Sequence, residues 1–393
     1  MTVERVAPRV LTGGEAVAEA MRQIDPDVVP VYPITPQTPI IQTFAKFVAN
    51  GRAHTEIVNV ESEHSAMSAA IGAALAGART MTATSSQGLA LMAEVVYIAA
   101  AMRAPIVMAL GNRARSGPIN IHCDHSDSML VRDSGAIQLF AENAQEAYDL
   151  TLLAPRIAEH PGVLLPVLVC QDGFTITHSA EPVSLLSDRK AKRFVGEYGV
   201  PFPLLDVKAP TTQGPFAMPD YYYEVRHQQV AAMSEALRVF DEVAGEYGDV
   251  AGRRYDVIET YELDDADRAI VCLGSTGGTI KDAIDALRAD GQRVGLLQLR
   301  SFRPLPVERI RATLRFVPHV AVLDRADSPG GRPPLYAEIA AALEGTDVHL
   351  RSFVYGLGGR EFHPEDVDDV LRELLAPHRS PVYVGLRGEA CRV

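Results

Sequence analysis

The first 180 or so residues alternate short runs of β-branched residues with Ala-rich stretches in which apolar positions recur every three to four residues. The short runs predict buried strands, and the longer period predicts helices. Strict alternation of the two is typical of a parallel sheet covered by helices on both faces. We expect strands at residues 28–32, 56–60, 80–84, 106–110 and 163–170, and helices at 14–24, 38–48, 63–76, 89–101 and 143–160.

The pattern changes between residues 178 and 220, where six prolines and the charged triplet Asp188-Arg189-Lys190 predict an extended connecting arm. A helix at 223–246 follows, and then a second α/β unit. Its strands are expected at 268–273, 294–299, 320–324 and 349–354, with helices at 280–289, 307–313, 335–343 and 364–375. The prediction is therefore an α/β protein with two parallel-sheet domains, 1–235 including the arm and 255–393.

Two helices of the first unit carry no polar face. Residues 63–76 and 89–101 are mostly Ala, Ser, Gly and Met around the whole circumference. Because such helices are normally buried, we expect them to pack against another subunit or domain as well as against the sheet.

Composition excludes some classes of function. A length of 393 residues suggests two or three domains, and the formal net charge of −13 argues against nucleic acid and anionic membranes as partners. The cysteines at 123, 170, 272 and 391 form no Cys-x-x-Cys pair, so this chain alone is expected to supply neither an iron–sulfur cluster nor a zinc site. No apolar run approaches the roughly 20 residues of a membrane span, and the isolated thiols suit a reducing compartment. A soluble, cytoplasmic protein is expected.

Polar residues follow four of the predicted strands, where ligands bind in open parallel sheets. They are Thr35, Glu63, the Ser85-Ser86-Gln87 segment and Arg113. Each has a structural alternative: Thr35 before a proline suits a helix N-cap, and Arg113 could be a surface cation. Together, a guanidinium with a two-pronged hydrogen bond, a hydroxyl and a helix N-terminus would suit the carboxylate of a 2-oxo acid.

Several strings around these positions resemble the α subunit of 2-oxoacid:ferredoxin oxidoreductases, most closely the separate-subunit type that acts on pyruvate. In the first unit they are YPITP at 32–36, ESEHSA at 61–66, TSSQGL at 84–89 and GNRARSGPINIH at 111–122, continuing through DHSD at 124–127 and RDSG at 132–135. In the second unit they are LGS at 273–275, RSFRP at 300–304 and YGLGG at 355–359. The resemblance thus runs nearly end to end.

The resemblance implies a thiamine diphosphate enzyme that converts a 2-oxo acid and coenzyme A into acyl-CoA, carbon dioxide and two electrons for ferredoxin, or runs the reverse synthase reaction. It implies a thiamine-diphosphate-binding, pyrimidine-side fold in the first domain and a transketolase-C-terminal-like fold in the second. Glu63 matches the glutamate that binds the aminopyrimidine ring and favours its imino tautomer, which then removes the C2 proton. Pro33 and Ile34 would lie beside the cofactor, and Thr35 and Arg113 match the substrate-binding threonine and arginine.

Two motifs of such enzymes are missing. There is no Gly-Asp-Gly with a following Asn for magnesium and pyrophosphate, the nearest string being Asp172-Gly173-Phe174, and there is no cluster motif. The resemblance therefore implies partner chains: a β subunit for pyrophosphate, Mg²⁺ and a [4Fe-4S] cluster, a ferredoxin-like δ subunit, and a γ subunit.

Other features receive plainer interpretations. The glycine turn at 274–278 lacks a Gly-x-Gly-x-x-Gly spacing and a Walker lysine, so we expect a tight βα turn, with a role near coenzyme A as a minor alternative. The spacing of His122, His125 and Asp127 does not suit a metal site, and structural or substrate-wall roles are expected.

Three functional alternatives follow: a pyruvate enzyme, an enzyme for branched-chain or other 2-oxo acids, and a non-catalytic scaffold subunit. The presence of Thr35, Glu63 and Arg113 together argues against the scaffold.

Overall fold

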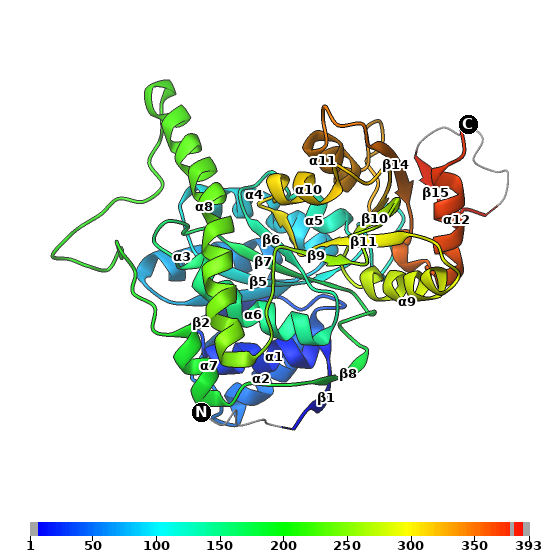
Figure 1. The fold of residues 1–393 in the computed structure, drawn as a ribbon. Helices are drawn as coiled ribbons and strands as arrows, with labels where there is room; N and C mark the ends of the chain where they lie inside the picture. Colours follow the sequence, from blue (N-terminus) through cyan, green and yellow to red (C-terminus); the bar gives the residue numbers. More distant parts are fainter. Residues whose placement is uncertain (1–6, 378–380, 388–393) are drawn as a thin grey trace.

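The computed structural model describes residues 7–377 and 381–387. Within this part the chain forms two large α/β sheets and one small antiparallel pair (Figure 1). The larger sheet has seven strands in the order β12-β6-β7-β5-β4-β2-β3, all parallel except β12. These strands are β2 (Val28–Val31), β3 (Glu56–Asn59), β4 (Thr80–Thr84), β5 (Ile106–Asn112), β6 (Ile137–Phe140), β7 (Val167–Asp172) and β12 (Ser301–Arg303).

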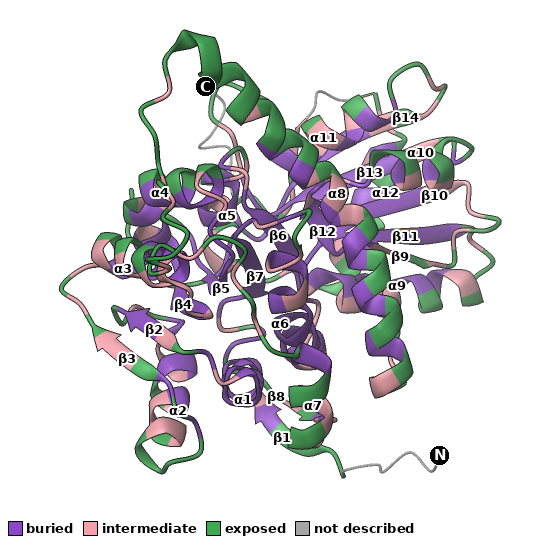
Figure 2. Ribbon diagram, turned by 90° about the vertical axis from the view of Figure 1, so that its left-hand side faces the viewer, coloured by how far each residue is buried: buried purple, intermediate pink, exposed green. Residues whose placement is uncertain are grey.

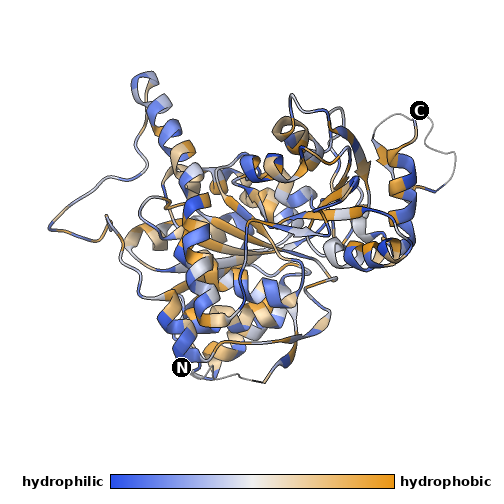
Figure 3. Ribbon diagram, in the orientation of Figure 1, coloured by the Kyte–Doolittle hydropathy of each residue, from blue (hydrophilic) through white to orange (hydrophobic). Residues whose placement is uncertain are grey.

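Helices cover both faces of this sheet, and its central strands β4 and β5 are therefore buried along their whole length. One face packs against α1 (Gly13–Ile24), α2 (Thr38–Ala49) and α6 (Ala144–Ala158). The other face packs against α3 (Glu63–Ala76) and α4 (Ser86–Ala101). The central strands are hydrophobic in Figure 3, as expected for parallel strands buried on both sides.

The second sheet has the order β15-β14-β13-β10-β11-β9 in the described part of the chain, with β9 antiparallel at one edge. Its elements are β9 (Ile258–Tyr261), β10 (Arg268–Leu273), α9 (Thr276–Ala289), β11 (Val294–Leu299), α10 (Val307–Leu314), β13 (His319–Asp324), α11 (Pro334–Ala342), β14 (His349–Val354), η1 (Leu357–Gly359), α12 (Pro364–Leu374) and β15 (Val382–Tyr383). One hydrophobic core runs from α3 and α4 through β10 and β11 to α10 and α11, so the two sheets share their packing.

A strand from the second half of the sequence also enters the first sheet. β12 pairs antiparallel with β6 and forms the edge of the sheet, and Ser301 lies opposite Leu139. The predicted division at residues 235–255 stays a prediction, but the two sheets are joined by more than a linker.

The connecting arm predicted for 178–220 is wrong in its first half. It contains β8 (Ala180–Val183), which pairs with β1 (Arg9–Thr12), and the helix α7 (Asp188–Val195). The charged triplet begins that helix because Asp188 accepts hydrogen bonds from Arg22, while Phe194 and Val195 are buried on its other face. Residues 196–218, which we call the connecting segment, contain no helix or strand.

The 33-residue helix α8 (Pro219–Ala251) leads from the connecting segment to the second sheet. Its described buried positions begin at Gln229, and its first turns are exposed, as Figure 2 shows at the end of α8. The short helix α5 (Ser126–Leu130) follows β5. In the part of the chain described here, no helix combines the length and apolarity needed to cross a lipid bilayer.

Candidate active site

The candidate site lies where the strand order of the first sheet reverses. From β2 the chain passes outward to β3 and then returns to β4 on the other side of β2. Such a reversal opens a crevice beyond the carboxyl ends of the two strands, which is where ligands bind in open α/β sheets. Thr35 follows β2 and the Ser85–Gln87 segment follows β4, so two of the predicted groups lie at this reversal.

Arg113 directly follows β5 and is only 6% exposed. Its Nη1 donates to the carbonyl oxygen of Thr35 at 3.0 Å, and its Nε donates to the carbonyl oxygen of Asn120 at 2.8 Å. Burial lowers the pKa of Arg113, and the nearby carboxylate of Asp127 opposes that shift. Among the described residues no acceptor pairs with Nη2, so the guanidinium is oriented by two backbone carbonyls and keeps free N–H groups for a ligand.

Thr35 is exposed and lies in a turn rather than at the helix start. The N-cap of α2 is Gln37, without a side-chain cap, so the predicted N-cap role of Thr35 is wrong. The reason is a turn in which the Ile34 carbonyl accepts from the backbone N–H groups of Gln37 and Thr38. Since the helix starts later, the Thr35 hydroxyl is not used as a cap. Pro33 is exposed and Ile34 half-buried in the same segment.

Glu63 is the first residue of α3 and is 8% exposed. Its side chain lies against Gly88, where an added Cβ would come within 2.9 Å of Glu63 Oε1 and 2.3 Å of Thr84 Oγ1. Glycine at position 88 therefore makes room for the carboxylate beside the end of β4. In the part of the chain described, no hydrogen bond reaches the Glu63 carboxylate, so its oxygens are available to a ligand.

Several buried polar atoms near these strand ends lack partners among the described residues. They are Thr84 Oγ1, Ser85 Oγ, Gln87 Oε1 and Asn112 Oδ1. Leaving a buried polar group unpaired costs about 1–3 kcal/mol, so a concentration of them points to a polar ligand that would pair with them. Together with Glu63, this set fits the hydrogen-bonding edge of an aminopyrimidine ring.

Asp127 holds the ends of β4 and β5 together. Its Oδ2 accepts from the backbone N–H of Ser86 at 3.0 Å and of Arg113 at 2.9 Å, and its Oδ1 accepts from Asn112 Nδ2 at 2.8 Å. Burial raises the pKa of Asp127 to about 6, and these hydrogen bonds oppose the shift. The structural role expected for Asp127 is thus found, but the sequence carries no signal for its partners, which lie 14 and 41 residues away.

A second buried carboxylate, Asp172 at the end of β7, joins the two sheets. It accepts from His125 Nε2 at 2.7 Å, from Arg325 Nη1 at 2.9 Å, and from the backbone N–H and hydroxyl of Ser275 at 3.0 and 2.6 Å. Burial opposes ionisation, but His125 and Arg325 hold the pKa of Asp172 well below its usual range. Cys123, His125 and Asp172 lie close enough to share a metal ion. The guanidinium on Asp172 disfavours a cation there.

The glycine turn after β10 binds the Asp172 carboxylate and does not form an open phosphate-binding loop. Ser275 provides two of the four hydrogen bonds to Asp172, and Gly274 has a φ of +69° with the Asp172 oxygens 2.9 Å from where its Cβ would lie. The turn therefore works as a tight connection that also docks the two sheets.

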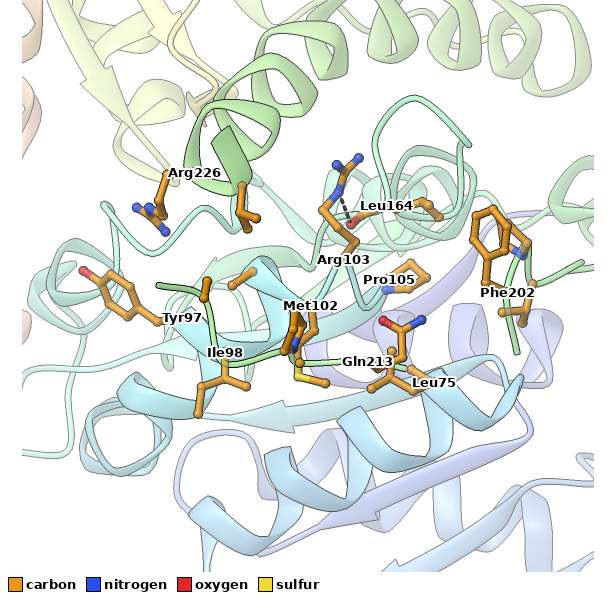
Figure 4. A pocket seen from close by; sticks show the side chains of 18 of the residues that line it. Leu75, Tyr97, Ile98, Met102, Arg103, Pro105, Leu164, Phe202, Gln213 and Arg226 are labelled. Atoms are coloured by element: carbon orange, nitrogen blue, oxygen red, sulfur yellow. Dashed lines mark hydrogen bonds between the residues drawn. The ribbon is translucent and has the colours of Figure 1, made fainter. Parts of the chain in front are cut away.

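A large cavity lies elsewhere. It encloses about 730 Å³ beneath the connecting segment, and its lining includes Leu75, Ile98, Met102 and Phe202 (Figure 4). Its walls come from α3, α4, α8 and the connecting segment. None of the predicted site residues lines it, so it plays no part in the site described above.

Comparisons with known proteins identify the family of this chain. The family model of the pyruvate flavodoxin/ferredoxin oxidoreductase, thiamine-diphosphate-binding domain matches residues 19–245, and that of the pyruvate:ferredoxin oxidoreductase core domain II matches residues 266–367. The chain is 54% identical to the pyruvate synthase subunit PorA of Thermotoga maritima, over 98% of this chain and 100% of that protein. It is 45% identical to PorA of Methanothermobacter thermautotrophicus, over 97% and 99%. It is 41% identical to the ketoisovalerate oxidoreductase subunit VorA of Pyrococcus horikoshii, over 93% of each.

Solved structures show the same fold. A 2-oxoglutarate:ferredoxin oxidoreductase from Magnetococcus marinus, solved with 2-oxoglutarate, coenzyme A and succinyl-CoA bound, has a TM-score of 0.74 and 20% identity. The match covers 94% of this chain and 66% of that one. A split-gene transketolase, as an inactive β4 tetramer, has a TM-score of 0.56 and 14% identity over 93% of this chain and 98% of that one. The expected α/β fold with a thiamine-diphosphate-type first unit is confirmed.

Proposed function

Because the chain belongs to the pyruvate flavodoxin/ferredoxin oxidoreductase family, we propose that it is the α subunit of a pyruvate:ferredoxin oxidoreductase, or pyruvate synthase. It would bind the 2-oxo acid and the aminopyrimidine side of thiamine diphosphate. The observation that carries this proposal is the group of unpaired buried polar atoms at the ends of β4 and β5, with Glu63 beside the end of β4 and Arg113 oriented by two backbone carbonyls after β5. The overall reaction would convert a 2-oxo acid and coenzyme A into acyl-CoA and carbon dioxide, with two electrons passed to ferredoxin, or run in reverse.

Pyruvate is the favoured substrate. The two pyruvate synthase subunits compared above are 54% and 45% identical to this chain. The ketoisovalerate oxidoreductase subunit is 41% identical. One extra methylene in an apolar pocket changes the transition-state free energy by about 1–3 kcal/mol, so a small number of wall residues decides between these acids.

Arg113 and Thr35 would hold the substrate. The Nε of Arg113 is already bonded to Asn120, so a carboxylate can meet the guanidinium only through its Nη1 and Nη2 end. The Thr35 carbonyl is bonded to Arg113, which leaves its hydroxyl for a substrate oxygen. Burial of the guanidinium strengthens its attraction to a carboxylate.

Glu63 would hold the cofactor ring. Its carboxylate would pair with a ring nitrogen of the aminopyrimidine, and the unpaired oxygens of Ser85 and Asn112 would bind polar groups nearby. When bound, thiamine diphosphate supplies the nucleophilic carbon that makes cleavage beside the 2-oxo group possible. Pro33 and Ile34 would form part of the wall beside that ring.

The remaining chemistry is assigned to partner chains. We propose a β subunit that carries the pyrophosphate site, Mg²⁺ and a [4Fe-4S] cluster, together with γ and δ subunits, coenzyme A as co-substrate and ferredoxin as electron acceptor. A subunit name in the relatives supports a multi-subunit complex. A cytoplasmic location is proposed because Cys123, Cys170 and Cys272 are free and buried.

Reconstitution tests this proposal. The chain should be co-produced with its partner subunits and assayed with pyruvate, 2-oxoisovalerate and 2-oxoglutarate, with coenzyme A and a viologen acceptor. We expect acceptor reduction with pyruvate as the preferred substrate, and none from this chain alone with added thiamine diphosphate and Mg²⁺. A complex that reduces the acceptor with none of the three acids would refute the proposed function, and turnover by the solitary chain would refute the division of labour.

A further inference from the structure

The loop that follows Arg113 reaches across to the second sheet. Residues 115–119 are exposed, and the loop is then held at Asn120, Cys123 and His125. Gly359 N–H donates to the Cys123 carbonyl at 2.7 Å, and His125 N–H donates to the Arg325 carbonyl at 2.8 Å. The loop carrying one end of the candidate site is therefore docked on the other unit.

Asn120 links this docking to Arg113. Its carbonyl oxygen accepts from Arg113 Nε, its Nδ2 donates to the Gly358 carbonyl at 2.9 Å, and its Oδ1 accepts from the His122 N–H at 2.6 Å. The side chain thus fixes the peptide whose carbonyl orients the guanidinium. Asn120 is half-buried, and its carbonyl oxygen, Nδ2 and Oδ1 all form hydrogen bonds.

The Gly356–Gly359 turn of the second unit is shaped to receive this side chain. Gly356, Gly358 and Gly359 all have positive φ, between 61° and 79°. A Cβ on Gly358 would lie 2.4 Å from Asn120 Nδ2, and one on Gly359 would lie 2.3 Å from the Cβ of His122. Side chains at 358 and 359 would therefore displace the loop as well as strain the turn.

We propose that Asn120, seated on the Gly356–Gly359 turn, is a positioning residue for Arg113, so that the second unit sets the affinity of the first for the substrate carboxylate. This inference rests on the proposed function. With Nε bonded, the guanidinium presents only its Nη1 and Nη2 end. When Asn120 is released, Nε becomes free and the side chain gains alternative orientations. Asn120 orients Arg113 and supplies no reacting group. Loss of its side-chain contacts should therefore weaken substrate binding and leave the cofactor step unchanged.

The test uses the assembled complex. Asn120→Ala keeps the backbone carbonyl but removes both side-chain anchors, and we expect the KM for pyruvate to rise about tenfold while kcat stays within about threefold of the parent value. Hydrogen–deuterium exchange at C2 of bound thiamine diphosphate should be unchanged, because that step does not need substrate. Asn50→Ala, at an exposed position after α2, is the matched control. An unchanged KM in Asn120→Ala overturns the inference.

A second variant pair keeps the test decisive if Asn120→Ala does not assemble. Gly358→Ala introduces the contact with Asn120, whereas Gly345→Ala has a similar φ of +75° with no atom within 4 Å of the added Cβ. Backbone strain is thus matched, and only Gly358→Ala should raise the KM. Equal KM values in Gly358→Ala and Gly345→Ala overturn the positioning role of Asn120. Failure of the parent complex to act on any 2-oxo acid would instead refute the proposed function.

Discussion

The guanidinium of Arg113 donates from Nη1 to the main-chain carbonyl of Thr35 over 3.0 Å, so the peptide after β2 orients a side chain that follows β5. The two substrate-binding residues are therefore coupled through the backbone of one and the side chain of the other. Substitutions at the two positions should have unequal effects.

Arg113→Lys should lower kcat/KM for the 2-oxo acid about 10–100-fold, which corresponds to roughly 1.4–2.7 kcal/mol of transition-state stabilisation. Lysine keeps the charge but cannot bond Thr35, Asn120 and a carboxylate in one plane. Steady-state kinetics of the assembled complex measure the change, and C2 exchange on bound thiamine diphosphate should stay near the parent rate. Arg115→Lys, at an exposed position, serves as control. Unaltered substrate kinetics together with weakened assembly would show that Arg113 is an interface residue.

Thr35→Val should lower kcat/KM only about 2- to 10-fold, because it removes one neutral hydrogen bond worth about 0.5–1.5 kcal/mol. The carbonyl that holds Arg113 remains. Thr43→Val, within α2, is the matched control for the loss of a hydroxyl. A decrease in kcat/KM as large as that of Arg113→Lys would contradict the proposal that Thr35 binds substrate through its hydroxyl alone.

Glu63→Gln should slow C2 exchange of bound thiamine diphosphate by about 10²–10⁴-fold, since a positioned acid–base group typically contributes that much. The amide keeps the shape that fits against Gly88 but loses the charge. Glu61→Gln, two residues earlier and fully exposed, is the control. If exchange in the assembled Glu63→Gln complex matches that of the parent, Glu63 has only a structural role.

The Asp127→Asn variant should change how stability depends on pH. The folded pKa of about 6 lies above the ordinary value of 3.8, so the folded chain binds this proton more tightly than the unfolded chain. The contribution of Asp127 to the free energy of unfolding therefore falls as pH rises from about 4 to 6, by on the order of 3 kcal/mol, and is constant above that range. In urea unfolding across this window, stability should fall with rising pH less steeply in Asp127→Asn than in the parent and in an Asp133→Asn control, and the remaining dependence in Asp127→Asn comes from other buried acids such as Asp324. Parallel curves for parent and Asp127→Asn would contradict the assignment.

Arg325→Met should destabilise the chain by about 3–5 kcal/mol, because it leaves Asp172 buried without its guanidinium partner. The pKa of Asp172 is depressed, so this stabilising contribution is present above the ordinary pKa of the carboxyl and is lost as pH falls toward the lower folded value. Thermal unfolding near neutral pH should show a lower Tm. Arg372→Met, which breaks an exposed ion pair with Asp369, should change it little. Equal Tm changes in the two variants would rule out a stabilising role for the buried pair.

Much of the framework was predictable from the sequence. The strands at 80–84, 268–273, 294–299 and 349–354 and the helix at 63–76 are confirmed at their predicted bounds. The strands are short runs rich in β-branched or apolar residues, and the helix is an Ala-rich stretch that begins after the N-cap Ser62 and ends at Gly77, so local sequence signals mark them. The three cysteines 123, 170 and 272 are described, whereas Cys391 lies outside the described residues.

The misses share a physical cause. β1, β8, β6 and β12 are strands of three or four residues, and pairing with distant partners, not periodicity, defines them. The helix α7 was not predicted because its charged residues suggested an extended arm. In the structure, Asp188 pairs with Arg22, 166 residues away. Likewise Asp172 and Ser275 are 103 residues apart, so no local pattern could connect them. The catalytic roles of Thr35, Glu63 and Arg113 stay predictions until the variants are measured.

The placement of β12 has a consequence for dissecting this chain. A fragment ending near residue 255 would keep β6 but lose the strand that covers its outer side, exposing a row of unpaired backbone groups next to Ile137 and Leu139. Uncovered strand edges of this kind recruit other chains and promote aggregation. The reciprocal fragment would carry Ser301–Arg303 with no sheet to join. The second half thus contributes a strand to the sheet of the first half, and truncating the gene at that boundary would yield aggregation-prone fragments that are unsuitable for activity measurements.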